Sequence, residues 1–291
     1  MTLKEFYLKY NKKIDEAISK ALNEDEVTRD ITSDLFKDAL KDKKVTAVLV
    51  CKEDCVLAGL DIFKRVMLKT DRHVKFITFR NDGSRIRNKT RVMKLIAAAD
   101  KLLAAERTAL NFIQRMSGIA TLTDMFVKKN KYKKAKILHT RKTTPNFRLF
   151  ELMAVKTGGG DFHRISLGSS VLIKDNHIKA AGGIVNVLKL IGTRSKALHG
   201  RKLEIEINDF NQIKSLLEYG KGIIDVVMLD NFTAEDAASA SKILKQNAFK
   251  VEISGNINHG NFELYQNRYA DYYSIGMLTH SYKSVDFSLE F

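Results

Sequence analysis

The chain has little of several residue types that would point to particular classes of protein. It holds no tryptophan, one proline and only two cysteines among its 291 residues. Two cysteines are too few for a disulfide framework, and Cys51 and Cys55 have no third or fourth cysteine nearby to complete a zinc site. We therefore expect both to be buried or half-buried free thiols.

Long apolar runs are also missing. No uninterrupted apolar stretch approaches the roughly 20 residues that a membrane-spanning helix needs. The first residues, Met1 to Tyr7, read as the start of an amphipathic helix rather than as a targeting segment. The composition, 44% hydrophobic and 29% charged, is typical of a soluble globular protein. We expect a cytoplasmic protein with no membrane partner.

Acidic residues are scarce relative to basic ones, 34 against 50, so the formal net charge is +16. A nucleic-acid-binding protein would gather such charge on one face, together with stacking aromatic residues or a known module. The sequence has no zinc-finger spacing, no RNP-like aromatic strand and no KH-like Gly-X-X-Gly loop. We interpret the excess, including the lysine cluster at 128–134, as a basic surface that steers anionic substrates, with no nucleic-acid partner.

Cationic side chains and glycines gather between residues 136 and 177. This stretch contains the only proline, Pro145, and the only triple glycine, at 158–160. Five cationic residues of this stretch follow short apolar runs: Arg141, Lys142, Arg148, Arg164 and Lys174. A multiply charged small anion needs several such donors, because each charge-assisted hydrogen bond contributes only about 1.5–3 kcal/mol. A solvated basic loop is the alternative, but the position after short apolar runs favours a ligand site.

The second half of the chain repeats one pattern, in which a short apolar run ends in polar residues. The six ends fall at or near Arg141, Lys174, Glu206, Asp230, Ser254 and Gly276. Their spacing suits strand–helix units of about 20 residues or more. Strands that are apolar throughout indicate a parallel sheet, whose carboxyl edge carries the ligand site in barrels and open sheets alike. Six such ends are fewer than a closed barrel requires, so we expect an incomplete, open α/β barrel.

The first third of the chain has a different pattern, which predicts an α+β layer separate from the parallel sheet. Val45–Val50 and Val74–Phe79 alternate like strands, and Asn81–Gly83 is typical of a turn. A helical pattern follows over 92–123, with an interruption at Ser117-Gly118.

These patterns predict two domains. The first is an N-terminal α+β sandwich-like domain over residues 1–115, on which the tail 281–291 packs back. The second, over residues 116–280, is the open α/β barrel that carries the ligand site.

Four ordered motifs carry a resemblance to a known family. They are Glu106–Asn111, Thr140–Pro145, Gly158–Arg164 and Leu172–His177. With them, the chain resembles the quinolinate phosphoribosyltransferases (nicotinate-nucleotide pyrophosphorylase, carboxylating), the type II phosphoribosyltransferases of NAD biosynthesis. Further matching segments extend over nearly the whole chain: Ala21–Asp25, Asp30–Ser33, Leu57–Leu60, Glu204–Glu206, Met228–Phe232, Ile253–Ile257 and Ser274–Ser281.

The resemblance implies a Mg²⁺-dependent enzyme. It would transfer the phosphoribosyl group of phosphoribosyl pyrophosphate to quinolinate with decarboxylation, giving nicotinate mononucleotide, pyrophosphate and CO₂. No general base is needed for the first step, because the nucleophile is the lone pair of the pyridine nitrogen. His163 is therefore expected to orient the substrate rather than to act as a base.

The resemblance also assigns site residues. Arg141, Lys142, His163 and Arg164 would hold the two carboxylates of quinolinate. Arg107 would enter the site from a neighbouring subunit, so a homodimer with a shared active site, or a higher oligomer, is implied.

A second set is assigned to phosphoribosyl pyrophosphate. Lys174 would lie near the pyrophosphate, and Glu206 and Asp230 would hold the ribose hydroxyls and position Mg²⁺, directly or through water. Backbone and side-chain donors for the 5′-phosphate would come from Ser254, Gly255, Asn256 and Gly276.

Some positions depart from the family pattern or allow two interpretations. Phe162 replaces a usual Asn, Gly168 lies where a larger residue is common, and Asn146 replaces a Gly whose left-handed backbone Asn also tolerates. Glu206 is preferred to Glu204, although alternation places both on one face of the strand. His139 could equally be a structural histidine or a ligand.

Three other functions remain as alternatives. A molybdenum-transport-associated relative shares the Thr-Arg-Lys and His-Arg elements but is expected to lack the segment 174–177. A nicotinate-specific phosphoribosyltransferase would need cations for one carboxylate only and would release no CO₂. A noncatalytic nucleic-acid-binding protein would explain the charge but not the strand-end pattern.

Overall fold

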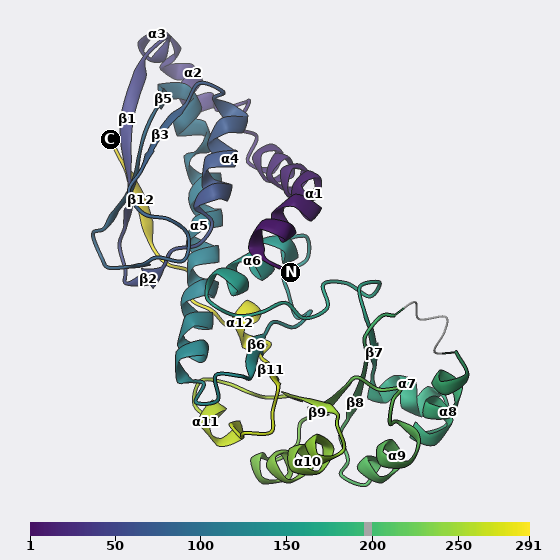
Figure 1. Ribbon diagram of the computed structural model, residues 1–291. Coiled ribbons are helices and arrows are strands. Elements are labelled where there is room, and N and C mark those ends of the chain that lie inside the picture. The colour runs from purple at the N-terminus through teal and green to yellow at the C-terminus, as the bar shows by residue number, and fades with distance from the viewer. Residues whose placement is uncertain (195–199) are drawn as a thin grey trace. The chain divides into compact units, whose positions relative to one another are not determined.

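The computed structural model describes residues 1–194 and 200–291 (Figure 1). The chain forms two compact units, each with its own sheet. The first unit comprises residues 1–125, 143–160 and 278–291, and the second comprises residues 126–142 and 161–277. In the described part of the chain, no helix is long and apolar enough to cross a membrane.

The first unit contains a four-stranded antiparallel sheet in the order β12-β1-β5-β3. Its strands are β12 (Phe287–Glu290), β1 (Lys44–Cys51), β5 (Arg91–Ala98) and β3 (Lys75–Thr78). A small ribbon pairs β2 (Cys55–Val56) with β4 (Arg85–Ile86). The last residues of the chain thus complete the sheet that the first hundred residues begin. Two of these strands, β1 and β3, confirm the alternating segments predicted from the sequence.

Six helices accompany this sheet in the first unit. They are α1 (Leu3–Glu24), α2 (Ile31–Leu35), α3 (Lys37–Leu40), α4 (Leu60–Thr70), α5 (Ala99–Lys129, of which the last four residues belong to the second unit) and α6 (Arg148–Thr157). The start of α1 is fixed by a capping box, in which Thr2 Oγ1 accepts from the Glu5 amide and the Glu5 carboxylate accepts from the Thr2 amide. Its buried residues recur at helical spacing, which confirms the amphipathic helix expected there.

The helix predicted from Val92 is wrong in its start and in its interruption. Residues 91–98 form strand β5, because their alternate side chains are buried and the segment pairs with both β1 and β3. The helix begins only at Ala99 and runs through Ser117-Gly118 without a break. The turn predicted at Asn81–Gly83 is confirmed: the Ser84 amide donates to the Asn81 carbonyl, and Gly83 has φ +86°.

Close packing explains why small polar residues occur in the middle of α5. A Cβ added at Gly118 would lie 2.2 Å from the carbonyl oxygen of Lys283, so only glycine lets the C-terminal segment approach the helix. The Ser117 hydroxyl accepts from the Ala58 amide at 3.0 Å, in the segment between β2 and α4. Ser117-Gly118, which resembles a helix break in the sequence, is therefore the place where two other segments of the chain contact α5.

The two cysteines lie close together in the first unit. Cys51 ends β1 and Cys55 begins β2; both are buried and free, and their Sγ atoms are 3.5 Å apart. The expectation of buried free thiols is confirmed.

The second unit is built on a six-stranded parallel sheet in the order β6-β11-β10-β9-β8-β7. Its strands are β6 (Lys136–Leu138), β7 (Val171–Ile173), β8 (Leu203–Ile207), β9 (Val226–Asp230), β10 (Lys250–Ser254) and β11 (Tyr272–Ser274). All six apolar runs recognised in the sequence are confirmed as strands. Within the described residues β6 and β7 do not pair with each other, so the sheet is an open α/β barrel.

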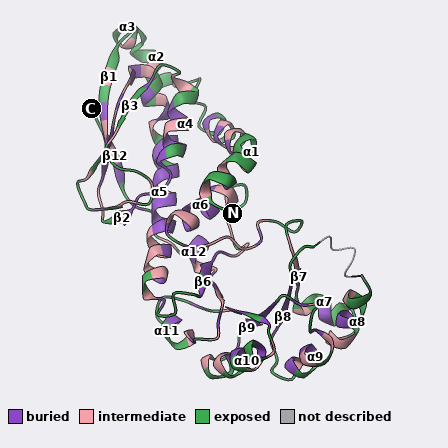
Figure 2. Cartoon of the chain, in the orientation of Figure 1, coloured by how far each residue is buried: buried purple, intermediate pink, exposed green. Residues whose placement is uncertain are grey.

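Helices connect these strands and cover the sheet. They are α7 (Asp175–Ala180), α8 (Ile184–Arg194), α9 (Gln212–Tyr219), α10 (Ala234–Gln246), α11 (Phe262–Tyr265) and α12 (Met277–His280, of which only Met277 belongs to this unit). The strands are mostly buried, whereas α8, α9 and α10 turn exposed faces away from them (Figure 2). Because the strands are largely apolar, most polar side chains collect where the strands end.

Candidate functional site

Polar residues predicted from the sequence meet at the carboxyl edge of the parallel sheet in the second unit. Arg141 and Lys142 follow β6, and Lys174 follows β7. Glu206 lies one residue before the end of β8, and Asp230 is the last residue of β9. Parallel strands present their carboxyl ends at one edge, so this topology gathers side chains from distant parts of the sequence. Arg107 differs, because it lies exposed on α5 in the first unit.

Lys174 and Glu206 form an ion pair at this edge, with 3.4 Å between Nζ and Oε2. Burial raises the pKa of the Glu206 carboxyl, the Lys174 ammonium opposes that shift, and the negative charge of Asp230 adds to it. Glu206 and Asp230 are therefore close enough to interact. The ammonium of Lys174 is exposed. A cationic or hydroxyl-bearing ligand can therefore replace it as the partner of the Glu206 carboxylate.

Arg164 is the most buried cation of the site, with 9% of its surface exposed. Its burial lowers the pKa of the guanidinium, and the positive charge of Arg141 lowers it further, while Glu204 and Glu206 oppose the shift. Arginine remains charged in proteins. Two guanidinium groups that repel each other in a shielded position gain stability from an anion placed between them.

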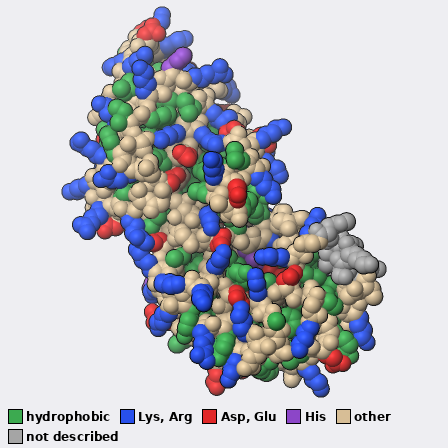
Figure 3. Space-filling view, viewed as in Figure 1, with side chains coloured by type: hydrophobic (Ala, Val, Ile, Leu, Met, Phe, Trp, Pro, Cys, Tyr) green, Lys and Arg blue, Asp and Glu red, His purple; other side chains and the backbone are tan. Residues whose placement is uncertain are grey.

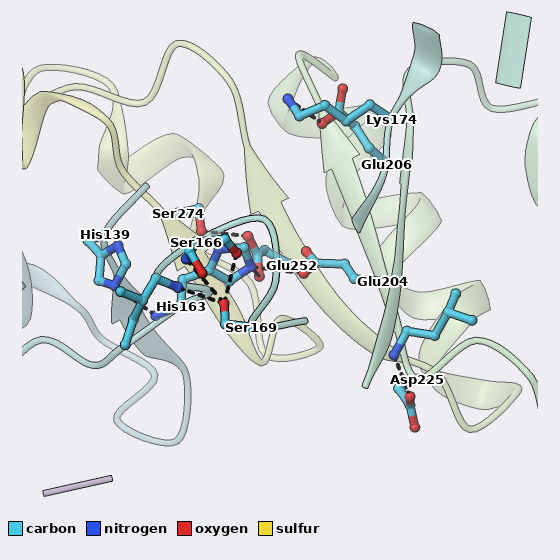
Figure 4. A network of polar contacts seen from close by, with 12 residues as sticks. His139, His163, Ser166, Ser169, Lys174, Glu204, Glu206, Asp225, Glu252 and Ser274 are labelled. Carbon is cyan, nitrogen blue, oxygen red and sulfur yellow. Dashed lines mark hydrogen bonds and ion pairs between the residues drawn. The ribbon is translucent and has the colours of Figure 1, made fainter. Parts of the chain in front are cut away.

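A buried polar network lies beside these cations (Figure 4). His163 Nε2 is 2.8 Å from Oε2 of Glu204 and 3.7 Å from Oε2 of Glu252. Oε1 of Glu252 accepts a hydrogen bond from the Ser274 hydroxyl. Burial is the main cause that raises the pKa of Glu204 to about 7 and that of Glu252 to about 8. Two carboxyls in one shielded site cannot both ionise easily, so at least one keeps its proton near neutral pH.

Sequence reasoning missed Glu252 and Ser274, and it preferred Glu206 to Glu204 although both alternate onto one face of the strand. The structure separates the two glutamates, since Glu204 joins His163 while Glu206 faces Lys174. The signal for Glu252 was present in the sequence as a lone carboxyl inside the apolar run Val251–Ile253. A carboxyl in a strand that is buried on both faces needs a polar partner.

The histidines of the site region have different contacts. His139 is fully buried, and its Nε2 accepts from the backbone amide of His163 at 3.1 Å, which favours the structural interpretation. His177 Nδ1 accepts from the Lys174 amide at 2.9 Å and thereby caps α7. Asp175 accepts from the Asn176 amide and forms an ion pair with Lys179, so its contacts are local to the first turn of α7.

The loops after β9 and β10 approach each other closely. Gly255 has φ +90°, and a Cβ there would lie 2.5 Å from the backbone nitrogen of Asn231. The Asn231 amide donates to the Ser254 carbonyl, and both Asn231 and Asn256 have left-handed backbones. Turns of this kind leave backbone N–H groups available to an anion. Gly276 follows β11 at the same edge of the sheet.

The positions that depart from the family pattern are accommodated locally. Asn146 has φ +62°, the left-handed backbone expected where the family has glycine. Ser169 Oγ accepts from the amides of Ile165 and Ser166 and closes the loop before β7. The Cβ position of Gly168 has open space around it. Phe162 packs edge-on against the His139 ring, with 6.2 Å between the ring centroids.

The charge of the protein is not concentrated at this site alone. Lys and Arg side chains are spread over both units on the face in view (Figure 3). The carboxyl edge is distinguished by cations that lie beside carboxylates in shielded positions. Such a site on an open α/β barrel defines an enzyme that binds small molecules carrying several negative charges.

Comparison of the chain with known protein families agrees with this class of enzyme. Residues 30–117 match the N-terminal domain of quinolinate phosphoribosyl transferase, and residues 119–290 match its C-terminal domain. The chain therefore belongs to the quinolinate phosphoribosyltransferase family.

Individual relatives are similar over most of their length. The probable nicotinate-nucleotide pyrophosphorylase [carboxylating] of Archaeoglobus fulgidus is 38% identical, over 85% of this chain and 94% of that protein. The Bacillus subtilis protein of the same name is 36% identical, over 86% of this chain and 84% of its own. The crystal structure of NadC from Streptococcus pyogenes superposes with a TM-score of 0.86 at 36% identity, covering 96% of this chain and 95% of that chain.

Proposed function

We propose that the chain transfers the phosphoribosyl group of phosphoribosyl pyrophosphate to quinolinate and decarboxylates the product. The reaction yields nicotinate mononucleotide, pyrophosphate and CO₂ and is a step of NAD biosynthesis. The observation that carries the proposal is the arrangement at the carboxyl edge, where the Arg141–Arg164 pair adjoins the carboxylates of Glu206 and Asp230. Guanidinium groups suit a dicarboxylate, and carboxylates suit a ribosyl group and its metal ion.

Quinolinate is assigned to the cationic side of the edge. Arg141, Lys142 and Arg164 bind its two carboxylates, and His163 orients them. The shielded position of Arg164 supports this assignment, because a charge-assisted hydrogen bond is stronger where water is excluded.

Phosphoribosyl pyrophosphate is assigned to the remaining strand ends. Lys174 binds the pyrophosphate, and Glu206 and Asp230 bind the ribose hydroxyls. Ser254, Gly255, Asn256 and Gly276 bind the 5′-phosphate, which the left-handed turn at Gly255 and Asn256 supports.

Mg²⁺ fits Glu206 and Asp230. It takes oxygen ligands and is usually held by one or two carboxylates together with substrate phosphates and water. The group of His163, Glu204 and Glu252 also places three ligand atoms within 4.8 Å of one another. An imidazole nitrogen suits transition metals better than Mg²⁺, so we assign Mg²⁺ to Glu206 and Asp230. When bound, the ion would neutralise charge on the leaving pyrophosphate.

The mechanism needs positioning and electrostatics from the protein rather than a base. The pyridine nitrogen attacks ribosyl C1 as the bond to pyrophosphate breaks, and Lys174 stabilises the departing charge. Positive charge that develops on the sugar lies beside Glu206 and Asp230. The positive charge of the alkylated ring nitrogen then stabilises the electron pair left on the adjacent ring carbon as CO₂ leaves, and that carbon takes up a proton from water.

Assembly, domain roles and location form part of the proposal. We assign catalysis to residues 116–280, with residues 1–115 and 281–291 forming the accompanying domain. The exposure of Arg107 supports a homodimer in which this residue enters the partner's site.

The free thiols of Cys51 and Cys55, which lie 3.5 Å apart, support a reducing compartment such as the cytoplasm.

The test is to incubate the protein with phosphoribosyl pyrophosphate, Mg²⁺ and quinolinate labelled in its 2-carboxylate. We expect labelled CO₂ and nicotinate mononucleotide in equal amounts, and loss of both after chelation of the metal ion. A parallel reaction with nicotinate should give no nucleotide. Turnover of nicotinate without CO₂ release would instead support a nicotinate-specific enzyme.

A further inference from the structure

The Glu252 carboxyl lies deep in the parallel sheet. Its strand β10 pairs with β9 on one side and β11 on the other, and 1% of the residue is exposed. Burying a polar group in this way costs several kcal/mol, about 2–7, unless hydrogen bonds compensate. A strand that needed only to pack would carry an apolar side chain here.

The partners of Glu252 connect it to the cationic side of the site. The Ser274 hydroxyl on the neighbouring strand β11 donates to Oε1. Oε2 lies 3.7 Å from His163 Nε2, which is itself 2.8 Å from Oε2 of Glu204. Figure 4 shows Glu252 between Ser274 and Glu204, with the His163 ring alongside. Carboxyls from two strands thus lie within 3.7 Å of one imidazole, and a hydroxyl from a third strand binds one of these carboxyls.

The same imidazole is fixed from its backbone. The His163 amide donates to Nε2 of His139, which is fully buried. Within the described residues, Nδ1 of His163 has no hydrogen-bond partner, whereas Nε2 faces the carboxyls. Nδ1 is therefore the ring atom left to meet a ligand.

We propose that Glu252 is a positioning residue for quinolinate: through Ser274 and Glu204 it holds the His163 ring so that Nδ1 faces a substrate carboxylate. The proposal rests on the assignment of His163 to quinolinate binding made above. Burial and the neighbouring Glu204 charge raise the pKa of Glu252 to about 8, so near neutral pH it can donate a proton to Glu204 while accepting from Ser274. Glu252 then has a partner on each side, with Ser274 as donor and Glu204 as acceptor.

The first experiment compares Glu252→Leu with Glu252→Gln. Leucine fills the space but cannot hydrogen-bond, whereas glutamine can still accept from Ser274 and donate to Glu204. We expect Glu252→Leu to raise KM for quinolinate about 10-fold or more, the usual scale for residues that orient a functional histidine. KM for phosphoribosyl pyrophosphate should stay within about twofold, and Glu252→Gln should recover most of the loss.

Ser241→Ala is the matched control. Ser241 is a buried hydroxyl on α10 that donates to the Ala237 carbonyl and has no link to His163. It should leave both KM values unchanged. Parallel rises of both KM values in Glu252→Leu, or no change in either, would overturn the proposal.

A second measurement needs no catalysis. The ring nitrogen signals of His163, observed by ¹⁵N NMR in histidine-labelled protein, should shift in Glu252→Leu and in Ser274→Ala but not in Ser241→Ala. Unchanged His163 signals in folded Ser274→Ala would contradict the network, even if Glu252→Leu does not fold. Failure of the wild-type protein to release CO₂ from quinolinate would sink the proposed function, while this measurement would still decide whether Glu252 positions the ring.

Discussion

Shielded charges at the carboxyl edge show how single residues acquire a function from their surroundings. Arg164 is buried beside a second guanidinium, that of Arg141, and its pKa is lowered by both effects. Lys174 is exposed but pairs with the buried Glu206. An anion placed between Arg141 and Arg164 would reduce the repulsion between the two guanidinium groups.

At this scale we predict that Arg164→Ala folds normally but loses about 2–5 kcal/mol in kcat/KM for quinolinate, because a desolvated substrate carboxylate is left without its partner. Steady-state kinetics and a thermal melt check both parts. Lys179→Ala is the control, since Lys179 forms only an exposed i,i+4 ion pair with Asp175. Unchanged kinetics in Arg164→Ala would remove this residue from the site.

Strands and loops set the positions of these residues. The parallel strands β6 to β11 end at one edge, and the turn at Gly255 brings the loops after β9 and β10 into contact. A left-handed glycine at such a point serves two purposes: it satisfies the backbone angle and leaves room for Asn231.

We predict that Gly255→Ala raises KM for phosphoribosyl pyrophosphate, because the new Cβ would lie 2.5 Å from the Asn231 nitrogen and must displace the loop. Gly222→Ala is the matched control, since Gly222 has φ +74° but open space around its Cβ position. Both variants should lose about 1–2 kcal/mol of stability for the left-handed angle, measured by denaturant unfolding. Equal KM values in the two variants would show that the loop does not bind the phosphate.

The elements also show what could be predicted from the sequence. The six parallel strands were recognisable because strands buried on both faces leave continuous apolar runs. Strand β5 was mistaken for helix, since its run of Val, Met, Leu, Ile and Ala suits either structure and only pairing with β1 and β3 decides. Gly118 was read as a helix break because its contact, Lys283, is far away in the sequence.

The whole molecule combines two units with separate sheets and an excess of positive charge. The proposed site residues lie in the second unit, with the exception of Arg107. A net charge of +16 attracts anionic substrates over distances of about a Debye length, roughly 8 Å at physiological salt. The net charge therefore raises the rate at which anionic substrates meet the protein, but it does not determine which of them binds.

At the scale of the assembly we predict complementation between two inactive variants. Arg107→Ala and Lys174→Ala chains, mixed under conditions that exchange subunits, should recover about a quarter to a half of wild-type activity per site if each site takes Arg107 from the partner, because heterodimers then hold one intact site. Each variant alone, treated identically, provides the control. No recovery despite demonstrated subunit exchange would mean that every site is built from one chain.

The sequence by itself determined the second unit's strands, the residues at their ends and the family, because these depend on local apolar runs and on contiguous motifs. Only the tertiary structure decided that Glu204 turns to His163 while Glu206 turns to Lys174, and that Glu252 and Ser274 join the first of these groups. The physical reason is that hydrogen bonds and ion pairs of buried groups form between residues far apart in the chain. Their partners are fixed by how neighbouring strands align, which no local pattern records.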